Sequence, residues 1–309
     1  MVICYFYNIF TMNVPPGFKA YHSKLLGNEF RNFMRYIGRP LNRYSIRVNT
    51  LKSDMRQVMR ILDEQHIDYG KIPWCSEGLW VSSNQLDILE HQLGYYYIQD
   101  ACSMIPAQVL EPEPGEKILD LCASPGSKTT QIAALMKNTG VLVANEPNTM
   151  RIRGLVYNIQ RCGVMNAVIT KQDGCIYSRF NEKFDRILVD VPCSDVGTVR
   201  KNPFALKLWS LDRIQKLSNL QKKLAAEGFR MLKPGGTMVY STCTTSIEEN
   251  EHVVEDILNN FNNSKLEKIK LPGLESMHGL TEKTRNCMRI LPQHNDTDSF
   301  FVAKVIKSG

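Results

Sequence analysis

The sequence predicts an α/β protein: a doubly wound, mainly parallel sheet with an antiparallel C-terminal edge, preceded by a small basic α+β domain. Three observations predict this organisation. Strand and helix patterns alternate between residues 117 and 240, polar residues close successive apolar runs, and a proline-rich segment separates this region from a shorter, basic one. The chain has 309 residues, 43% of them hydrophobic, and is long enough to bury a sizeable core.

The clearest break in the chain is the run EPEPG at residues 111–115. Two prolines and a glycine disfavour both a helix and a central strand at this point. We therefore place a domain boundary after Pro112, with a small domain over residues 1–112 and a larger one over residues 113–309.

The smaller domain carries patterns of both strand and helix. Residues 44–49 alternate with a period of two and predict a strand. A helix follows, with Ser53 as its expected cap. The apolar side chains of this helix recur at helical spacing at Met55, Val58, Met59 and Leu62. Gly70 is expected to end that segment, and residues 78–81 predict another short strand.

The larger domain repeats a strand–helix rhythm. Strands are expected at residues 117–121, 141–145, 167–169, 186–190 and 237–240. Helices are expected at residues 129–137, at 151–161 and in a long segment that ends near Leu232, before a turn at Gly235 and Gly236. Residues 288–291 and 300–305 flank a polar loop and predict a hairpin, which adds the antiparallel edge.

Positive charge is concentrated at the start of the chain. The net charge is +7, and residues 1–60 hold ten lysines or arginines against two acidic residues. Such a segment is typical either of a phosphate-binding surface or of a solvated basic face.

The nine cysteines form neither a CxxC motif nor a paired framework. A disulfide scaffold or a zinc ribbon is therefore disfavoured, and a reducing compartment, the cytoplasm, is expected. Six cysteines fit buried, small hydrophobic positions: Cys4, Cys75, Cys102, Cys162, Cys175 and Cys287. Residues 1–10 are apolar but have no basic leader and are too short to span a bilayer, so we expect a first strand or an ordered tail there.

A turn of small residues follows the first strand of the larger domain, between Asp120 and Thr129. Small side chains let a ligand approach the backbone, and the start of the next helix offers unpaired N–H groups. The segment matches neither the P-loop nor the G-x-G-x-x-G pattern, so a nucleoside triphosphate or a dinucleotide is disfavoured. The turn predicts a nucleoside-like ligand, although a plain tight turn has the same composition.

Acidic residues close four successive strands: Asp120, Glu146, Asp173 and Asp190. In a doubly wound sheet the ligand lies beyond the carboxyl ends of the strands. Glu146 stands 26 residues after Asp120, where such folds place an acid on ribose hydroxyls. One such acid alone is more often a cap, but four in order indicate a binding edge.

Two cysteines fall on the same edge. Cys193 follows the strand that ends at Asp190, and Cys243 follows the strand over residues 237–240. Two thiols beside an acid fit a metal site, a redox pair or covalent catalysis. No histidine or further cysteine stands at ligand spacing, which argues against a metal, and the absence of CxxC argues against redox chemistry.

Three motifs carry a resemblance to a known family. Residues 122–129 (CASPGSKT), 190–194 (DVPCS) and 240–244 (YSTCT), in this order, resemble the Nop/Sun family of RNA cytosine-5 methyltransferases. Supporting segments are residues 47–52, 97–100, 289–292 and 297–301, so the similarity extends from about residue 40 to the C-terminus. Ser127 departs from the family, which usually has a second glycine there, and residues 293–295 (QHN) carry less histidine than is usual.

The resemblance implies a Rossmann-like class I methyltransferase that takes S-adenosylmethionine as methyl donor and RNA as substrate. It places Glu146 on the ribose of the donor and Asp173 near its adenine, and it counts Asp190 among the donor-binding residues. The small domain is expected to be an RRM-like RNA-binding domain. The donor itself is expected over the turn formed by Cys122, Ala123, Ser124, Pro125, Gly126, Ser127 and Lys128.

Carbon 5 of cytosine is too weak a nucleophile to accept a methyl group unaided. A thiolate that adds to carbon 6 makes carbon 5 enamine-like, and after methyl transfer a base removes the carbon-5 proton so that the thiol leaves. The resemblance implies Cys243 as nucleophile, Cys193 as the residue that assists release and Asp190 as the contact to the cytosine edge. Lys128 is expected to add positive charge that lowers a thiol pKa. The residues alone leave the order of the two cysteines open, since DNA cytosine methyltransferases place their nucleophile in a Pro-Cys pair.

The substrate has several candidates. Small stand-alone members of the family tend to modify tRNA, which favours tRNA, and rRNA is the second candidate. The fold alone also permits methylation of DNA, protein or small molecules, but paired cysteines argue against protein N-methylation and small molecules, which need no covalent adduct. A non-catalytic RNA-binding or assembly protein with a vestigial donor pocket is the rival from another class. We expect a monomer without a bound metal.

Overall fold

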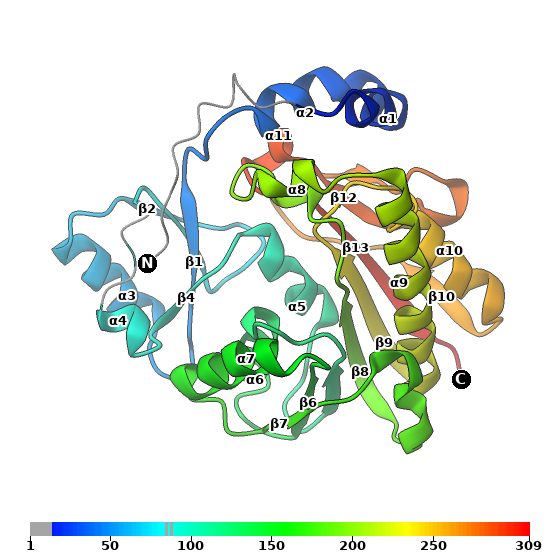
Figure 1. The fold of residues 1–309 in the computed structure, drawn as a ribbon. Helices are drawn as coiled ribbons and strands as arrows, with labels where there is room; N and C mark the ends of the chain where they lie inside the picture. The colour runs from blue at the N-terminus through cyan, green and yellow to red at the C-terminus, as the bar shows by residue number, and fades with distance from the viewer. Residues whose placement is uncertain (1–13, 84–85, 87–88) are drawn as a thin grey trace.

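The computed structural model describes residues 14–309 except 84–85 and 87–88, and it contains two sheets (Figure 1). The strand or tail expected at residues 1–10, with Cys4, lies outside the described residues. The smaller sheet is antiparallel, in the order β2-β3-β1-β4. Its strands are β1 (Tyr44–Val48), β2 (Tyr69–Lys71), β3 (Gly78–Val81) and β4 (Tyr96–Ile98). The helices of this part of the chain are α1 (Pro16–Leu26), α2 (Phe30–Ile37), α3 (Met55–Glu64) and α4 (Leu89–Gln92).

The larger sheet has the order β11-β12-β13-β9-β8-β5-β6-β7, with β10 paired to β13. Its parallel strands are β5 (Lys117–Asp120), β6 (Val141–Asn145), β7 (Ala167–Thr170), β8 (Phe184–Asp190) and β9 (Leu232–Thr242). Its antiparallel strands are β10 (Ser264–Glu267), β11 (Met277–His278), β12 (Met288–Ile290) and β13 (Phe300–Lys307). The parallel strands run outward from β5 in both directions, so the predicted doubly wound sheet with an antiparallel C-terminal edge is confirmed.

Helices cover both faces of the larger sheet (Figure 1). Side chains alternate along each strand, so Ile118 and Val239 face α5 and α6, whereas Leu119 and Met238 face α9 and α10. Apolar residues on both faces explain why these strands are nearly continuous hydrophobic runs in the sequence. The helices are α5 (Ile105–Leu110), α6 (Ser127–Leu135), α7 (Thr149–Cys162), α8 (Phe204–Lys207), α9 (Leu211–Met231), α10 (Glu251–Asn260) and α11 (Pro292–Asn295).

Three local boundaries differ from those expected. The cap of α3 is Asp54, whose carboxylate accepts a hydrogen bond from the first turn, whereas the Ser53 hydroxyl bonds to a carbonyl of a neighbouring loop. Gly70 lies inside β2, because α3 has already ended at Glu64. Gly235, with φ +79°, belongs to an irregular start of β9, which begins directly after α9 rather than after a separate turn.

Helices α1 and α2 pack against the larger domain, although they precede the small sheet in the chain. Phe18 and Phe33 are buried in a cluster with Val196, Leu206 and Leu291. Helix α5 lies before the expected boundary at residue 112 but packs on β8, β9 and β13 of the larger sheet. The division at residue 112 stays a prediction, and the two parts share an extensive apolar contact.

The basic residues of the first sixty positions are not all on the surface. Arg47 is buried, and it donates to the Ser127 carbonyl (2.7 Å) and to the Thr130 hydroxyl (2.8 Å) at the start of α6. The Arg43 guanidinium is half-buried over the Trp80 ring. The exposed ones are Lys19, Lys24, Arg31, Arg35, Arg39, Lys52, Arg56 and Arg60. Among the described helices, none is long and apolar enough to cross a membrane.

Candidate active site

The turn after β5 is shaped by Gly126, which caps α6 with φ +105°. This left-handed conformation favours glycine, and a Cβ there would stand 3.1 Å from Leu155. Ser127 begins α6 and is not among the residues with positive φ, so serine replaces the usual glycine without strain. The helix starts two residues earlier than expected. Small residues therefore leave the backbone of the turn accessible at the carboxyl edge of the sheet.

The two acids expected to hold the donor each make contacts within the protein, which leave a carboxylate further acceptor positions for a ligand. Glu146 is buried, accepts a hydrogen bond from the Asn148 N–H (2.9 Å) and pairs with Arg151 (3.3 Å). Asp173 is exposed and caps a 3₁₀ helix by accepting the Cys175 N–H (2.9 Å). Both lie after β6 and β7, as the sequence predicted, but neither lines the cavity described next.

A cavity of about 350 Å³ opens between the turn and the small sheet. Pro125, Ser127 and Lys128 line it from the turn, and Asp190 and Cys243 line it from the ends of β8 and β9. The small domain contributes the segment 97–100, and β13 contributes its first residue. The segments that carried the family resemblance therefore meet at one cavity.

Lys128 and Asp190 form an ion pair inside this cavity, with 2.7 Å between Nζ and Oδ2. Lys128 also donates to the Ser103 hydroxyl (3.0 Å), and the Ser241 hydroxyl donates to the second oxygen of Asp190 (2.6 Å). Burial lowers the pKa of Lys128, but Asp190, Cys243 and Asp120 together raise it more, so the net pKa lies above its usual value. Lys128 is only 8% exposed, so it is a buried lysine and not a surface residue at the start of α6.

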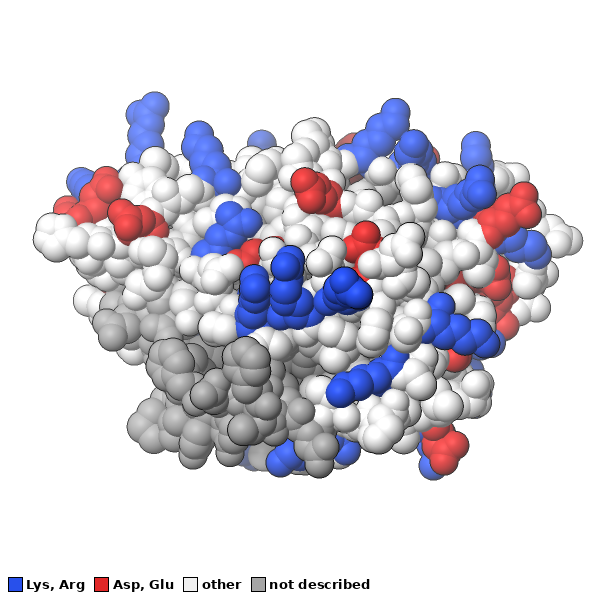
Figure 2. All heavy atoms as spheres, turned by 90° about the horizontal axis from the view of Figure 1, so that it is seen from above, with Lys and Arg blue, Asp and Glu red and all other residues white. Residues whose placement is uncertain are grey.

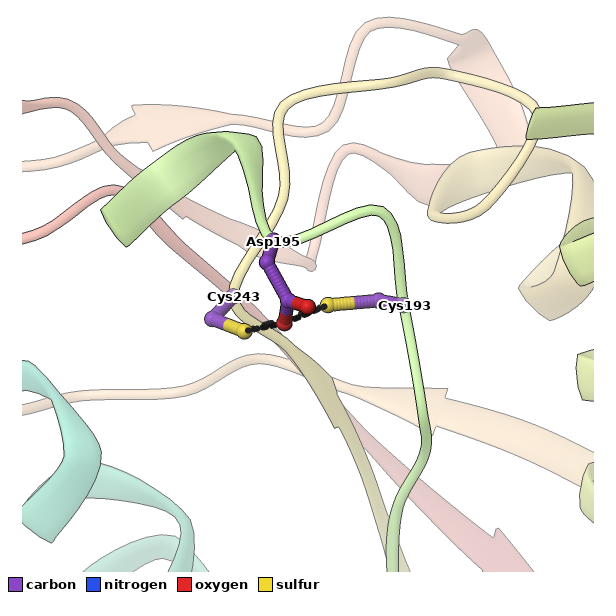
Figure 3. A group of neighbouring side chains, drawn as sticks. All are labelled: Cys193, Asp195 and Cys243. Carbon is purple, nitrogen blue, oxygen red and sulfur yellow. Dashed lines mark hydrogen bonds between the residues drawn. The ribbon is translucent and has the colours of Figure 1, made fainter. Parts of the chain in front are cut away.

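The two thiols lie side by side, with 3.1 Å between the sulfur atoms of Cys193 and Cys243 (Figure 3). Cys193 is buried at 5% exposure, whereas Cys243 is half-buried and lines the cavity. The carboxylate of Asp195 points between them and accepts from both, at 3.5 Å from Cys193 and 3.2 Å from Cys243. The geometry places one thiol at the cavity wall and the other directly behind it.

The contact between the thiols has opposite effects on them. It raises the pKa of Cys193, and burial adds to this, so that the pKa lies well above its ordinary value. The same contact lowers the pKa of Cys243, but burial, Asp195 and Asp190 together raise it more. The lowering expected from Lys128 is therefore not seen: the lysine is held by Asp190, and the net direction for Cys243 is upward.

Three donor atoms, from Cys193, Asp195 and Cys243, lie within 4.8 Å of one another. Structural zinc takes four protein ligands, and catalytic zinc takes three with an open position. The absence of a metal stays a prediction, and the sequence argument for it did not consider Asp195.

A second charged cluster borders the cavity and was not predicted. Lys201 is paired with Asp100 and with Asp298, the latter at 2.9 Å. Burial and the neighbouring Asp100 raise the pKa of Asp298 to about 7. Asp100 and Asp298 belong to segments that supported the family resemblance. The sequence therefore marked these segments as important but indicated no role for either acid.

The remaining described cysteines are free thiols, and Cys75, Cys102, Cys162 and Cys287 are buried as predicted. Cys175, which was expected to be buried, is half-buried in the 3₁₀ segment Gly174–Phe180. Cys122 of the turn is also half-buried, and burial raises its pKa well above the usual value.

Comparison with known proteins assigns both parts of the chain. Residues 107–306 match the family model of the 16S rRNA methyltransferase RsmB/F, and residues 14–101 match the N-terminal domain of 16S rRNA methyltransferase RsmF. The chain belongs to the RsmB/F family of RNA cytosine-5 methyltransferases. RsmB/F enzymes belong to the Sun family, so the predicted resemblance is confirmed. Enzymes of this family depend on S-adenosylmethionine, as was also predicted.

Relatives within the RsmB/F family act on different RNAs. The chain is 40% identical to the tRNA (cytosine(49)-C(5))-methyltransferase of Pyrococcus abyssi, over 96% of this chain and 99% of that protein. It is also 40% identical to ribosomal RNA small subunit methyltransferase F of Vibrio cholerae, over 96% of this chain but 64% of the relative. The chain thus spans less than two thirds of the length of this bacterial enzyme.

Solved structures of similar proteins share the whole architecture. A methyltransferase homolog from Pyrococcus horikoshii superposes with a TM-score of 0.85 at 32% identity and covers 97% of both chains. NSun6 from the same organism, solved with SFG, has a TM-score of 0.87 at 24% identity and covers 96% of this chain and 98% of that one. At 24% identity, the similarity to NSun6 is evidence for the fold alone.

Proposed function

We propose that this RsmB/F family member methylates carbon 5 of cytosine in tRNA through a covalent bond between Cys243 and carbon 6 of the base. The observation that carries the proposal is the position of Cys243 at the cavity wall, beside the Lys128–Asp190 pair and 3.1 Å from a second thiol. This is the set of groups that the reaction needs: a nucleophile, a polar contact to the base edge and a group behind the nucleophile to assist its release.

The residues of the turn suit S-adenosylmethionine. Gly126 keeps the turn open, and one oxygen of Asp120 is buried without a partner among the described residues, which leaves an acceptor at the strand end. When bound, the donor supplies an electrophilic methyl group on a sulfonium cation, which nearby carboxylates favour. Residues 122–128 would hold it, with Glu146 on the ribose, Asp173 near the adenine and Asp190 at the border with the base.

The protein's own groups then orient the cytosine. Asp190 accepts from the exocyclic amino group, and its ion pair with Lys128 holds the carboxylate in place. Cys243 attacks carbon 6, and Cys193 assists the loss of the thiol after methylation. The target base must be unpaired or flipped out to enter.

The RNA backbone would be held by α1 and α2. Figure 2 shows the face above these helices, where lysines and arginines outnumber acidic side chains. Lys19, Lys24, Arg31 and Arg35 are exposed on the two helices, and basic contacts of this kind bind phosphates without reading sequence. We propose residues 1–112 as the RNA-binding part, a monomeric enzyme and a cytoplasmic location, since the described cysteines are free thiols.

A second candidate substrate is rRNA. The family models that match both parts of the chain describe 16S rRNA enzymes, whereas the relative matched over its full length acts on tRNA. Full-length coverage favours tRNA, because the bacterial rRNA enzyme has a further third of its length that this chain does not match.

The test is to incubate the enzyme with isotope-labelled S-adenosylmethionine and separate pools of tRNA and rRNA, and to digest each pool to nucleosides. We expect labelled 5-methylcytidine from tRNA. In the same assay Cys193→Ala accumulates a covalent protein–RNA adduct on denaturing gels, whereas Cys243→Ala does not. Cys287→Ala serves as the control, because it removes a buried thiol that lies in the hydrophobic core directly before β12. A chelator is expected to leave the parent rate unchanged, and chelator-sensitive activity would favour a metal between the thiols.

A further inference from the structure

Asp195 stands between the two thiols, and the sequence analysis assigned no role to it. Its Oδ1 atom accepts from Cys243 at 3.2 Å and from Cys193 at 3.5 Å (Figure 3). Cys243 and Asp195 are 48 positions apart, and they meet because the loops after β8 and β9 leave the sheet at adjacent strands. The carboxylate therefore contacts the sulfur atom that is proposed to react.

The loop holds Asp195 in this position against its conformational preference. The residue has φ +60°, in the left-handed region, and its carbonyl accepts bonds from the N–H (3.0 Å) and hydroxyl (2.9 Å) of Thr198. The Gly197 N–H donates to the Cys243 carbonyl (2.8 Å), and a Cβ on Gly197 would approach the Ser299 carbonyl to 2.2 Å. The two loops are thus joined through their backbones, and the carboxylate is aimed at the thiols by a fixed turn.

The other carboxylates near the thiols are already engaged. Asp190 is held by Lys128 and Ser241, and the buried Glu249 accepts from Ser194 and Gln221. Lys128, the nearby cation, is likewise bound to Asp190. Within the described residues around Cys243, Asp195 is the carboxylate in hydrogen-bond contact with its sulfur.

We propose that Asp195 is the catalytic base that takes the proton of the Cys243 thiol, an inference that rests on the covalent mechanism proposed above. As the sulfur–carbon 6 bond forms, the S–H bond breaks and its proton passes to the Asp195 carboxylate, while the π pair of carbon 5 and carbon 6 moves to carbon 5. When the double bond reforms and the sulfur leaves, Asp195 returns the proton to it. Between these two steps carbon 5 uses that pair to bond the methyl group of the donor. It then loses its proton to solvent, or to Cys193 once that thiol has given its own proton to solvent, and the freed C–H pair reforms the double bond.

A buried thiol needs such an acceptor. Burial and the surrounding acids hold the pKa of Cys243 above its ordinary value, so little thiolate exists at neutral pH. The groups that face this sulfur are Cys193, Asp195, Asp190 and Lys128, and together they do not favour its free thiolate. Transfer of the proton during attack avoids a separate, unfavourable ionisation, and a positioned base typically contributes about 10²–10⁴-fold.

The experiment measures the rate of adduct formation in the Cys193→Ala enzyme, with total tRNA or total rRNA and S-adenosylmethionine, on denaturing gels. Asp195→Asn keeps the shape and tolerates positive φ, and Asp195→Gly is a second variant that fits the turn without strain. Both are expected to form adduct at least about 100-fold more slowly at neutral pH. Their rate should then rise about tenfold per pH unit towards the thiol pKa, with unchanged donor affinity and melting temperature.

The alternative role of Asp195 is purely electrostatic, and it predicts the opposite sign. A carboxylate that only raises the thiol pKa would slow the reaction, so either variant would then form adduct as fast as, or faster than, the Cys193→Ala enzyme. That result overturns the inference and leaves the covalent mechanism standing. If the Cys193→Ala enzyme itself forms no adduct with either RNA pool, the covalent mechanism fails and the inference fails with it.

Discussion

Arg289 and Glu251 form a buried ion pair beneath the loop that carries Cys243. The guanidinium meets the carboxylate at two points, Nε–Oε1 at 2.6 Å and Nη2–Oε2 at 2.7 Å, and the side chains are 2% and 0% exposed. Replacement in Arg289→Met keeps the approximate length but leaves the carboxylate buried and unpaired. Breaking such a pair from one side costs about 3–5 kcal/mol, much more than an exposed pair contributes.

The same arginine connects stability to the site. Its Nη1 donates to the carbonyl of Thr245 (2.8 Å), two residues after Cys243. We therefore expect Arg289→Met to lower the free energy of unfolding by about 3–5 kcal/mol, and its melting temperature by at least about 6 °C. The rate of adduct formation should also fall, because the nucleophile loop loses one of its anchors.

Denaturant unfolding and calorimetry measure the effect, with Arg60→Met as the matched control. Arg60 pairs with Glu64 at 3.9 Å, but both side chains are about 70% exposed, so its loss should cost at most about 1 kcal/mol. The double variant Arg289→Met/Glu251→Leu removes both charges and is expected to recover much of the stability. If Arg289→Met unfolds within about 0.5 kcal/mol of the Arg60 control, the argument from burial is refuted.

Two further predictions follow from the buried acid of β5 and from the basic helices. Burial raises the pKa of Asp120 from 3.8 to about 7. The protonated carboxyl therefore contributes stability that is fully present below pH 3.8 and is lost as the pH rises to about 7. The unfolding free energy of the parent should therefore fall between those values, relative to Asp120→Asn, by up to about 1.4 kcal/mol per pH unit; parallel curves would contradict this. Charge reversal on α1 and α2 should weaken tRNA binding at least about tenfold in filter binding and reduce its salt dependence, with donor affinity unchanged. The variant is Lys24→Glu, Arg31→Glu and Arg35→Glu, and the control, expected to bind normally, is Lys265→Glu, Lys268→Glu and Lys270→Glu at the exposed edge near β10.

The parallel strands could be predicted from the sequence because each is buried on both faces. Burial on both sides requires a nearly continuous apolar run, and polar residues at the end of each run mark the edge where ligands bind. Asp190 and Cys243 were placed correctly at one edge by this argument alone. The cap of α3 was missed because Ser53 and Asp54 are both good caps, and only the backbone decides which one is in place.

Contacts between segments that are distant in the chain could not be predicted from the sequence. Arg47 was counted with a basic surface, yet it is buried against the start of α6, 80 residues away in the chain. Its burial depends on how the small sheet docks, and composition carries no information about docking. Asp195 was missed for a related reason: beside Cys193 in the sequence it resembles any loop acid, and its contact with Cys243 depends on the turn at Gly197.

The order of the two cysteines shows what geometry adds to resemblance. The residues alone left it open, because either thiol follows a strand at the correct edge. In the structure Cys243 is half-buried and lines the cavity, whereas Cys193 is buried and is not among the residues that line it. A nucleophile must be reached by the base, and Cys243 satisfies this condition. Cys193, which is more deeply buried, is better placed to act once the adduct occupies the cavity. Accessibility therefore supports, on grounds independent of family motifs, the assignment of Cys243 as the attacking group.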